Sequence, residues 1–187
     1  LVLSAFLNML GFGQLIAGSL SDRIGRRPVL VYGSLLFVLS GFGALLANSI
    51  EILVFMRTLQ GLGAAACMAM GRVIISDSFQ HAEAGRQMST ITMFQSVVPL
   101  LGFSFGGVLA DLVGWRGSVG LMVVTAAIVF AGASMLLEES RDPSIKPVPA
   151  PRIIFVYWQL LVTPLFIANA MMAATVTSVY FLSLIHI

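Results

Sequence analysis

The chain has 187 residues, of which 58% are apolar and only 10% are charged, against roughly 25% charged residues in an average soluble domain. Ten basic and eight acidic residues leave a net charge of +2. So few polar groups cannot coat a soluble surface, and the composition excludes a soluble globular protein, a disordered chain and a nucleic-acid binder. A single cysteine, Cys67, and two distant histidines, His81 and His186, exclude a disulfide framework and offer no metal-ligand spacing.

Six apolar segments are long enough to cross a bilayer, which takes about 20 residues per helix. They cover residues 1–20, 29–47, 52–75, 88–110, 118–137 and 164–185. Their length and their lack of period-two alternation exclude strands, so we predict an all-α polytopic membrane protein. The first segment has no basic leading region and no cleavage site, so it is not a signal peptide. We expect a fragment of a longer protein; the alternative is a complete six-helix protein.

The loops between these segments differ in charge from one side of the membrane to the other. The loops at 20–28, 76–87 and 138–163 hold or adjoin eight of the ten basic residues: Arg23, Arg26, Arg27, Arg72, Arg86, Arg141, Lys146 and Arg152. The loops at 48–51 and 111–117 hold only Arg116. Because basic loops stay in the cytoplasm, we expect the first three loops to be cytoplasmic and the other two to face outward.

A proline-rich linker precedes the last segment. Four prolines fall within residues 141–151, and this composition breaks helices. Tyr157 and Trp158 suit the membrane interface, so we expect residues 152–163 to form a short helix on the cytoplasmic surface. Pro164 would then open the last span, where its missing N–H is harmless. The alternative is that 153–163 extends that span without a break.

The first cytoplasmic loop has the most specific spacing in the chain. It reads G-x-L-x-D-R-x-G-R-R-x-x-L from Gly18 to Leu30. Gly18 would let a neighbouring helix approach closely, and Gly25 can supply the backbone angle of a tight turn. Asp22 lies near the membrane boundary, where a carboxylate is costly unless it meets a cation. The nearby basic residues, Arg23, Arg26 and Arg27, can pair with it or with lipid phosphates; the alternative is a positive-inside anchor without further role.

This spacing resembles motif A of the major facilitator superfamily, which joins the second and third helices of a twelve-helix fold. The resemblance implies that residues 1–137 hold the second to sixth helices, the N-terminal half without its first helix. Residues 138–163 would be the central cytoplasmic linker with its interfacial helix, and 164–187 the first helix of the C-terminal half. The chain would then contain about six of an expected twelve transmembrane helices.

Arg57 lies inside the third apolar segment, about 9 Å along the helix from Glu51 at 1.5 Å per residue. Gln60, Gly61 and Ala64 share its face, which indicates a water-filled cavity or tight helix packing. The alternative is that Arg57 snorkels to the interface.

The stretch that starts at Arg57 resembles motif B of the same superfamily, R-x-x-Q-G-x-G-A, and includes Gly61 and Gly63. In that family the arginine is linked to proton transfer. A guanidinium does not itself release a proton; it would lower the pKa of a nearby carboxyl or hold an anionic group. The resemblance places the acidic partner on the first helix, which this chain lacks.

The third segment ends at Asp77, and the resemblance implies that Asp77 pairs with Arg26. The pair would lock the cytoplasmic side while the protein faces outward and break when it opens inward. The alternative is a solvated boundary charge. The run from Gln60 to Ala66, together with Arg72 and Asp77, most resembles the Bcr/CflA drug-resistance branch.

The fourth segment contains Pro99, Gly102, Gly106 and Gly107. The small-xxx-small glycine pair allows close backbone contact, and the proline would kink the helix. The three glycines resemble part of the antiporter motif C, although Phe103 stands where that motif has proline, which weakens the antiporter assignment. The alternative is a dimerising glycine face.

Four uncharged polar residues within spans are candidates for lining a substrate cavity: Asn8, Gln60, Gln95 and Asn169. The alternative is that such side chains bond a neighbouring helix. Several methionines within spans would suit a pocket for varied apolar compounds, or simply pack.

The resemblance implies secondary transport by alternating access, with proton-coupled efflux of a drug-like or amphipathic metabolite. We expect a protein of the bacterial cytoplasmic membrane, monomeric when full length, with a small-molecule substrate, the lipid bilayer as partner, and no cofactor beyond the coupling proton. The alternatives are an importer of a sugar or organic acid and a non-transporting membrane protein. The sequence has neither the clustered histidines or paired intramembrane acids of an embedded enzyme nor the P-loop of an ATP-driven pump.

Overall fold

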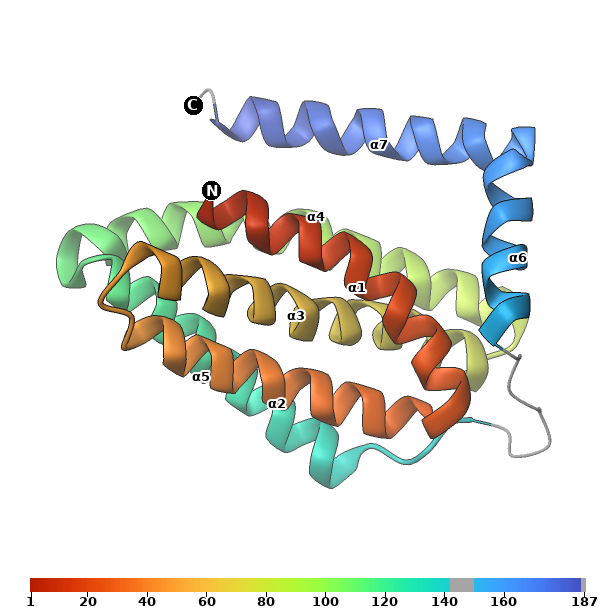
Figure 1. Ribbon diagram of the computed structural model, residues 1–187, viewed down its shortest axis with the longest axis horizontal. Coiled ribbons are helices and arrows are strands. Elements are labelled where there is room, and N and C mark those ends of the chain that lie inside the picture. Colours follow the sequence, from red (N-terminus) through yellow and green to blue (C-terminus); the bar gives the residue numbers. More distant parts are fainter. Residues whose placement is uncertain (142–149, 186–187) are drawn as a thin grey trace. The chain divides into compact units, whose positions relative to one another are not determined.

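The computed structural model describes residues 1–141 and 150–185, and within these ranges the regular structure is helical. The helices are α1 (Val2–Ile24), α2 (Arg26–Leu45), α3 (Ile50–Ser78), α4 (His81–Val113), α5 (Trp115–Leu136), α6 (Ala150–Val162) and α7 (Pro164–Ile185) (Figure 1). The chain divides into two compact units, Leu1–Ile145 with α1 to α5 and Lys146–Ile187 with α6 and α7. Lys146 and the proline-rich part of the predicted linker lie outside the described residues.

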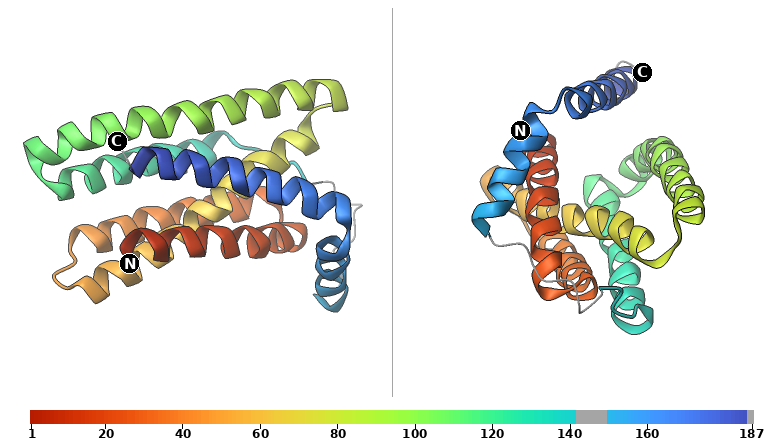
Figure 2. Two further views of the ribbon diagram at one scale, coloured as in Figure 1. Left: turned by 90° about the horizontal axis from the view of Figure 1, so that it is seen from above. Right: turned by 90° about the vertical axis from the view of Figure 1, so that its right-hand side faces the viewer.

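In the first unit, α3 is the central helix and packs along both α1 and α2. α2 also packs on α5, and α4, green in Figure 2, packs chiefly on α5. A small apolar core joins the first three helices through Ala17, Val29, Ala66 and Met70, all buried. This core lies about one to three helical turns from the charged helix ends.

Glycines allow the close approach of α3 to its neighbours. A Cβ placed on Gly61 would lie 2.5 Å from the carbonyl oxygen of Phe6 in α1. A Cβ on Gly63 would lie 2.6 Å from the carbonyl oxygen of Gly33 in α2. Small residues let helix backbones approach one another, which is a main source of packing energy between helices in a membrane.

Four helices among the described residues are long and apolar enough to cross a membrane: α1, α2, α3 and α5. The bent pair Phe155–Val162 and Pro164–Met172 adds a fifth if it is counted as one span. The described residues therefore contain four to five candidate spans where the sequence predicted six. The segments predicted at 88–110 and 164–185 are helical, as part of α4 and as α7.

The helices in the first unit extend beyond the apolar segments, so the predicted loops are too long. α1 runs to Ile24 and α2 begins at Arg26, which reduces the predicted loop 20–28 to Gly25 alone. Most of the predicted loop 76–87 is likewise helical, because α3 reaches Ser78 and α4 begins at His81. Hydropathy marks the edge of the hydrocarbon, whereas a helix continues past it with its charged side chains extending outward.

In the second unit the chain breaks at Thr163, between the end of α6 and the start of α7 at Pro164. The two helical segments meet at an angle of 77°. Pro164 occupies the first helical position, where no N–H is needed. The chain therefore does not continue as one straight helix through 153–185, and the position of α6 at a membrane surface stays a prediction.

We predict that Gly63→Ala destabilises the protein, because the new methyl group would press against the backbone of α2. Overpacking of this kind costs about 1–3 kcal/mol. The measurement is thermal unfolding of the purified full-length gene product. Gly71→Ala is the matched control, since it lies on the same helix with nothing within 4 Å of its Cβ position. Equal melting temperatures for the two variants would contradict close packing at Gly63.

Candidate functional site

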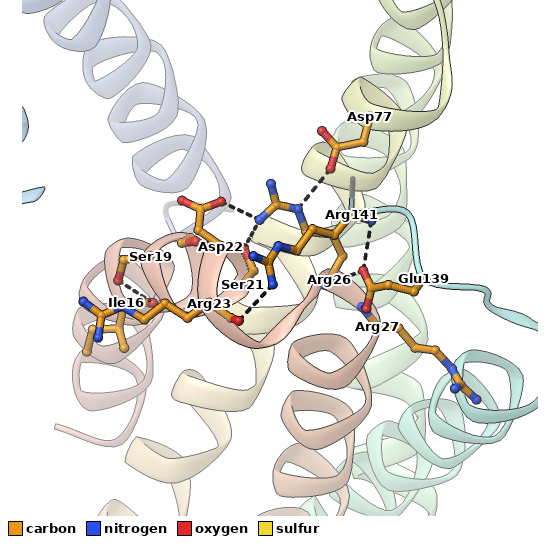
Figure 3. Close-up of polar contacts among 11 residues, drawn as sticks. Ile16, Ser19, Ser21, Asp22, Arg23, Arg26, Arg27, Asp77, Glu139 and Arg141 are labelled. Atoms are coloured by element: carbon orange, nitrogen blue, oxygen red, sulfur yellow. Dashed lines mark hydrogen bonds and ion pairs between the residues drawn. The ribbon is translucent and has the colours of Figure 1, made fainter. Parts of the chain in front are cut away.

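Arg26 is the centre of a polar cluster at which the ends of α1, α2 and α3 meet (Figure 3). Its Nη1 donates to Asp22 Oδ1 at 2.6 Å and to Ser21 Oγ at 2.8 Å, both in the last turn and a half of α1. Its Nε donates to Asp77 Oδ2 at 3.0 Å, at the end of α3. The Arg26 side chain is 14% exposed, against 45% for Asp22 and 30% for Asp77. One nearly buried cation therefore links carboxylates from two helices.

The turn at Gly25 makes this arrangement possible. Gly25 has φ +105°, a conformation that glycine adopts readily and side-chain-bearing residues avoid. The turn directs the chain from the end of α1 straight into α2, and it lets Arg26 reach back to Asp22 four residues earlier. Arg23, in the last turn of α1, carries positive charge at the negative end of the helix dipole.

Glu139, which the sequence analysis did not single out, caps the start of α2. Its Oε1 accepts from the backbone N–H of Arg26 at 2.8 Å, and its Oε2 accepts from that of Arg27 at 3.2 Å. These N–H groups have no acceptor within their own helix, and a carboxylate there also interacts favourably with the helix dipole. A Cβ on Gly25 would collide with this carboxylate. Glu139 follows α5 in the chain, so no local capping pattern next to α2 could have revealed it.

Two arginines of the predicted cytoplasmic loops, Arg27 and Arg141, cap helix ends. Arg27 Nη2 donates to the carbonyl oxygen of Ser134 in α5 at 2.8 Å. Arg141 Nη1 donates to the carbonyl oxygen of Arg23 in α1 at 2.9 Å, while its backbone N–H donates to Glu139 Oε1 at 3.0 Å. Terminal carbonyls of a helix lack intrahelical donors, and cations near them are favourable. The cluster therefore binds the ends of α1 and α5 as well as the start of α2.

The carboxylate of Glu139 has a lowered pKa. Its partial burial acts to raise the pKa, but the backbone N–H groups of Arg26, Arg141 and Arg27, with the charge of Arg26, outweigh that effect. A lowered pKa means that the stabilisation is complete above the ordinary glutamate value of about 4.3 and is lost as the pH falls through the lowered value. Glu139 is thus a constant anion at neutral pH.

A second polar group lies inside the bundle around Arg57. Its Nη1 donates to Gln60 Oε1 at 3.1 Å, and Met122 Sδ of α5 lies 3.8 Å from the same nitrogen. Gln60 is fully buried. Arg57 Nε and Gln60 Nε2 are both buried and have no hydrogen-bond partner in the part of the chain that the structure describes. Buried donors of this kind are costly to leave unpaired. Arg57 lies against protein groups, so the structure does not favour the snorkelling alternative.

The other cavity candidates make local or interhelical bonds. Asn8 and Asn169 each donate to a carbonyl four residues earlier in their own helices, at 2.8 Å. Gln95 of α4 accepts from Arg72 Nη2 of α3 at 3.1 Å, so it joins two neighbouring helices.

The motif glycines fall into two groups. Gly61 and Gly63 lie against neighbouring backbone, as described above. Nothing in the described chain lies within 4 Å of a Cβ on Gly18, Gly102, Gly106 or Gly107. Helix α4 continues through Pro99. The packing role of these four glycines stays a prediction, since no atom of the described residues lies at their Cβ positions.

Arg116 occupies the opposite end of α2 from the Arg26 cluster. Its Nε donates to the carbonyl oxygen of Leu45 at 3.2 Å and its Nη2 to that of Ala47 at 3.4 Å. Its guanidinium carbon lies 4.5 Å from the centre of the Trp115 ring. This end of the bundle therefore has a single arginine cap in place of a charged cluster.

The chain is similar in sequence to one family of proteins and to several of its individual members. The family model for the Major Facilitator Superfamily matches residues 1–187. The chain is 32% identical to Multidrug resistance protein D of Escherichia coli (strain K12) over 152 residues, 81% of this chain and 37% of that protein. It is 31% identical to the Chloramphenicol resistance protein of Pseudomonas aeruginosa over 169 residues, 88% of this chain and 38% of that protein. It is 37% identical to Multidrug transporter MdfA of Yersinia pestis bv. Antiqua (strain Angola) over 131 residues, 70% and 32% of the two chains.

The chain thus spans well under half of the length of these relatives. Among solved structures, a crystal structure of the peptide transporter POT in complex with alafosfalin has a similar fold, with a TM-score of 0.59. That likeness covers 98% of this chain and 36% of the other, at 19% sequence identity.

We predict that Gly25→Ala destabilises the protein by about 1–3 kcal/mol from its backbone conformation alone, because φ +105° with ψ 162° is a combination that essentially only glycine adopts. Displacement of the Glu139 carboxylate adds to this loss. Thermal unfolding of the full-length gene product measures it. Gly18→Ala is the control, because Gly18 lies in the same motif but inside α1, with open space at its Cβ position. A Gly25→Ala protein as stable as the Gly18→Ala protein would refute this account of the turn.

Proposed function

Because this chain belongs to the Major Facilitator Superfamily, a family of membrane transporters and not enzymes, we propose that it forms part of a proton-coupled efflux protein. The substrates would be drugs or amphipathic metabolites, moved by alternating access. Relatives named for multidrug and chloramphenicol resistance support the substrate class. On this proposal α1 to α5 are the second to sixth helices of a twelve-helix transporter, and α7 is the seventh.

The observation that carries the proposal is the contact of Arg26 with both Asp22 and Asp77. Asp22 and Arg26 flank one tight turn, so they move together, whereas Asp77 belongs to a different helix. The Arg26–Asp77 bond can therefore break while the Arg26–Asp22 bond persists. Partly exposed ion pairs are worth only about 0–1 kcal/mol each, so the bond can bias a conformation without fixing it. We assign it to the lock that holds the cytoplasmic side closed in the outward-facing state.

The proton-coupling role falls to Arg57. Its Nε and the Nε2 of Gln60 are buried donors without an acceptor in the described chain. A carboxylate from a helix outside this chain would satisfy both, and the fixed charge of Arg57 would lower the pKa of that carboxyl. When the carboxyl moves away from Arg57, its pKa rises and it binds a proton. Transport could thus be coupled to proton binding without any change in the charge of the arginine itself.

The charges at the two ends of the bundle support the predicted orientation. Arg23, Arg26, Arg27 and Arg141 all lie at the end where α1 meets α2, and Arg116 lies at the other end. Basic residues favour the cytoplasmic side. We therefore assign the Arg26 end to the cytoplasm of a bacterial cell and the Arg116 end to the outer face of its cytoplasmic membrane.

Expression of the full-length gene product in an efflux-deficient bacterial strain tests the proposal. We expect resistance to several toxic amphipathic compounds, and we expect a proton uncoupler to abolish their export. Export that persists with the uncoupler would refute proton coupling. Uptake of a sugar or organic acid without any resistance would refute efflux and indicate an importer.

We predict that Arg57→Ala lowers export at least about tenfold, because it removes a charge-assisted interaction worth about 1.5–3 kcal/mol. Arg57→Lys should restore part of the activity, since a lysine keeps the charge but not the planar fork. The control is Thr58→Ala, the next residue along, whose hydroxyl bonds only the carbonyl of Val54 among the contacts described. Normal export by Arg57→Ala would rule out the coupling role.

A further inference from the structure

We propose that Glu139 and Arg141 form a clasp that positions Arg26 for its bond to Asp77, and so set the strength of the cytoplasmic lock. This inference rests on the proposed function, because it concerns the same lock. It adds two positioning residues that lie after α5, outside motif A. Neither the composition nor the motif spacing of the chain pointed to them.

The first step is that Glu139 acts on the main chain of the residue whose side chain makes the lock. Its carboxylate accepts from the N–H of Arg26 at 2.8 Å and from that of Arg27 at 3.2 Å. These are the first two residues of α2. Fixing both N–H groups fixes the start of the helix, and with it the direction in which the Arg26 side chain leaves the backbone.

The second step is that Arg141 holds the other side of the same turn. Its Nη1 donates to the carbonyl oxygen of Arg23, two residues before Gly25, at 2.9 Å. Its own N–H donates to Glu139 Oε1 at 3.0 Å, so the two clasp residues are also bonded to each other. One short segment therefore holds the end of α1 and the start of α2 together.

The third step concerns the space at the turn. The absence of a side chain at Gly25 leaves the volume that the Glu139 carboxylate occupies. Arg27 extends the contact further, because its Nη2 donates to the carbonyl oxygen of Ser134 in the last turn of α5. The turn is thus bonded both to the last turn of α5, through Ser134, and to the segment that follows α5, through Glu139. A movement of α5 would therefore change the position of Arg26.

The Glu139 carboxylate of the clasp contacts different groups from the carboxylates of the lock. Glu139 is bonded to the main-chain N–H groups of Arg26, Arg27 and Arg141 and interacts with the charge of Arg26, while Asp22 and Asp77 bond the Arg26 side chain. Its pKa is lowered, so it stays ionised above the ordinary glutamate range. We therefore expect Glu139→Gln to change the rate of export without changing the shape of its pH profile.

A double-mutant cycle tests the clasp in the purified full-length gene product. Glu139→Gln keeps the size of the side chain but loses the charge and one accepting oxygen, and Asp77→Asn weakens the lock. If Glu139 acts by positioning Arg26, the double variant should lose clearly less melting temperature than the sum of the two single losses. Additive losses would overturn the proposal. Should Glu139→Gln fail to fold, Glu139→Asp keeps the charge with a shorter reach and enters the same cycle.

Two controls test whether the coupling is specific to Glu139 and the lock. Glu139→Gln combined with Arg116→Ala should be additive, because Arg116 caps the far end of α2, about 30 Å away along a 20-residue helix. Glu138→Gln removes a charge from the exposed neighbouring position and should leave the melting temperature near that of the wild type. A loss in Glu138→Gln as large as in Glu139→Gln would mean that charge near the turn, and not the clasp, matters.

The export assay separates this proposal from the proposed function. We expect Glu139→Gln to reduce export severalfold in the wild-type background and to have little further effect in the Asp77→Asn background. We also expect Arg141→Lys to retain more export than Arg141→Ala. A protein that exports nothing in any variant would refute the proposed function, while the melting-temperature cycle would still decide whether the clasp exists. Equal effects of Glu139→Gln on export in both backgrounds would overturn the clasp even in an active transporter.

Discussion

The bond network of Arg26 determines how the charged end of this bundle is built. A guanidinium has five N–H donors in a fixed plane, so it can serve acceptors from different helices at the same time. Here it bonds Ser21, Asp22 and Asp77, and its main-chain N–H bonds Glu139. Three helices and the segment after α5 thus converge on one residue. These bonds hold the end of α1 next to the start of α2. The turn between the two helices has a single residue, so it leaves little freedom in how they are placed relative to each other.

Arg26 and Arg57 show two opposite uses of one side-chain type. Arg26 has carboxylate partners and lies at a helix end, where solvent reaches the acids around it. Arg57 lies inside the bundle, where its Nη1 bonds a neutral amide oxygen and a thioether and its Nε has no hydrogen-bond partner in the described chain. A buried cation without a counter-charge is unfavourable unless it is paired or its cavity holds water. The first arginine is therefore suited to holding a structure together, and the second to an exchange of partners.

Composition and hydropathy were enough to predict a helical membrane protein, because twenty-residue apolar runs have few other structures available to them. The approach of Arg26 to Asp77 also followed from motif resemblance. Helix ends did not, since α1 continues through Asp22 and Arg23 where hydropathy had already ended the span. Glu139 escaped prediction for a different reason. It caps a helix that begins 113 residues earlier, and only the folded chain brings the two together.

The single-residue turn at Gly25 has a consequence for how the chain tolerates changes in length. Each residue in an α-helix rotates its side chain by about 100° around the axis. A loop of several residues could absorb an insertion, but here α1 ends at Ile24 and α2 begins at Arg26. One added or deleted residue would turn every side chain of α2 away from its partners on α3 and α5, including the glycine surfaces that let the backbones meet. The rotation of α2 about its own axis, and so its contacts with α3 and α5, is set at Gly25.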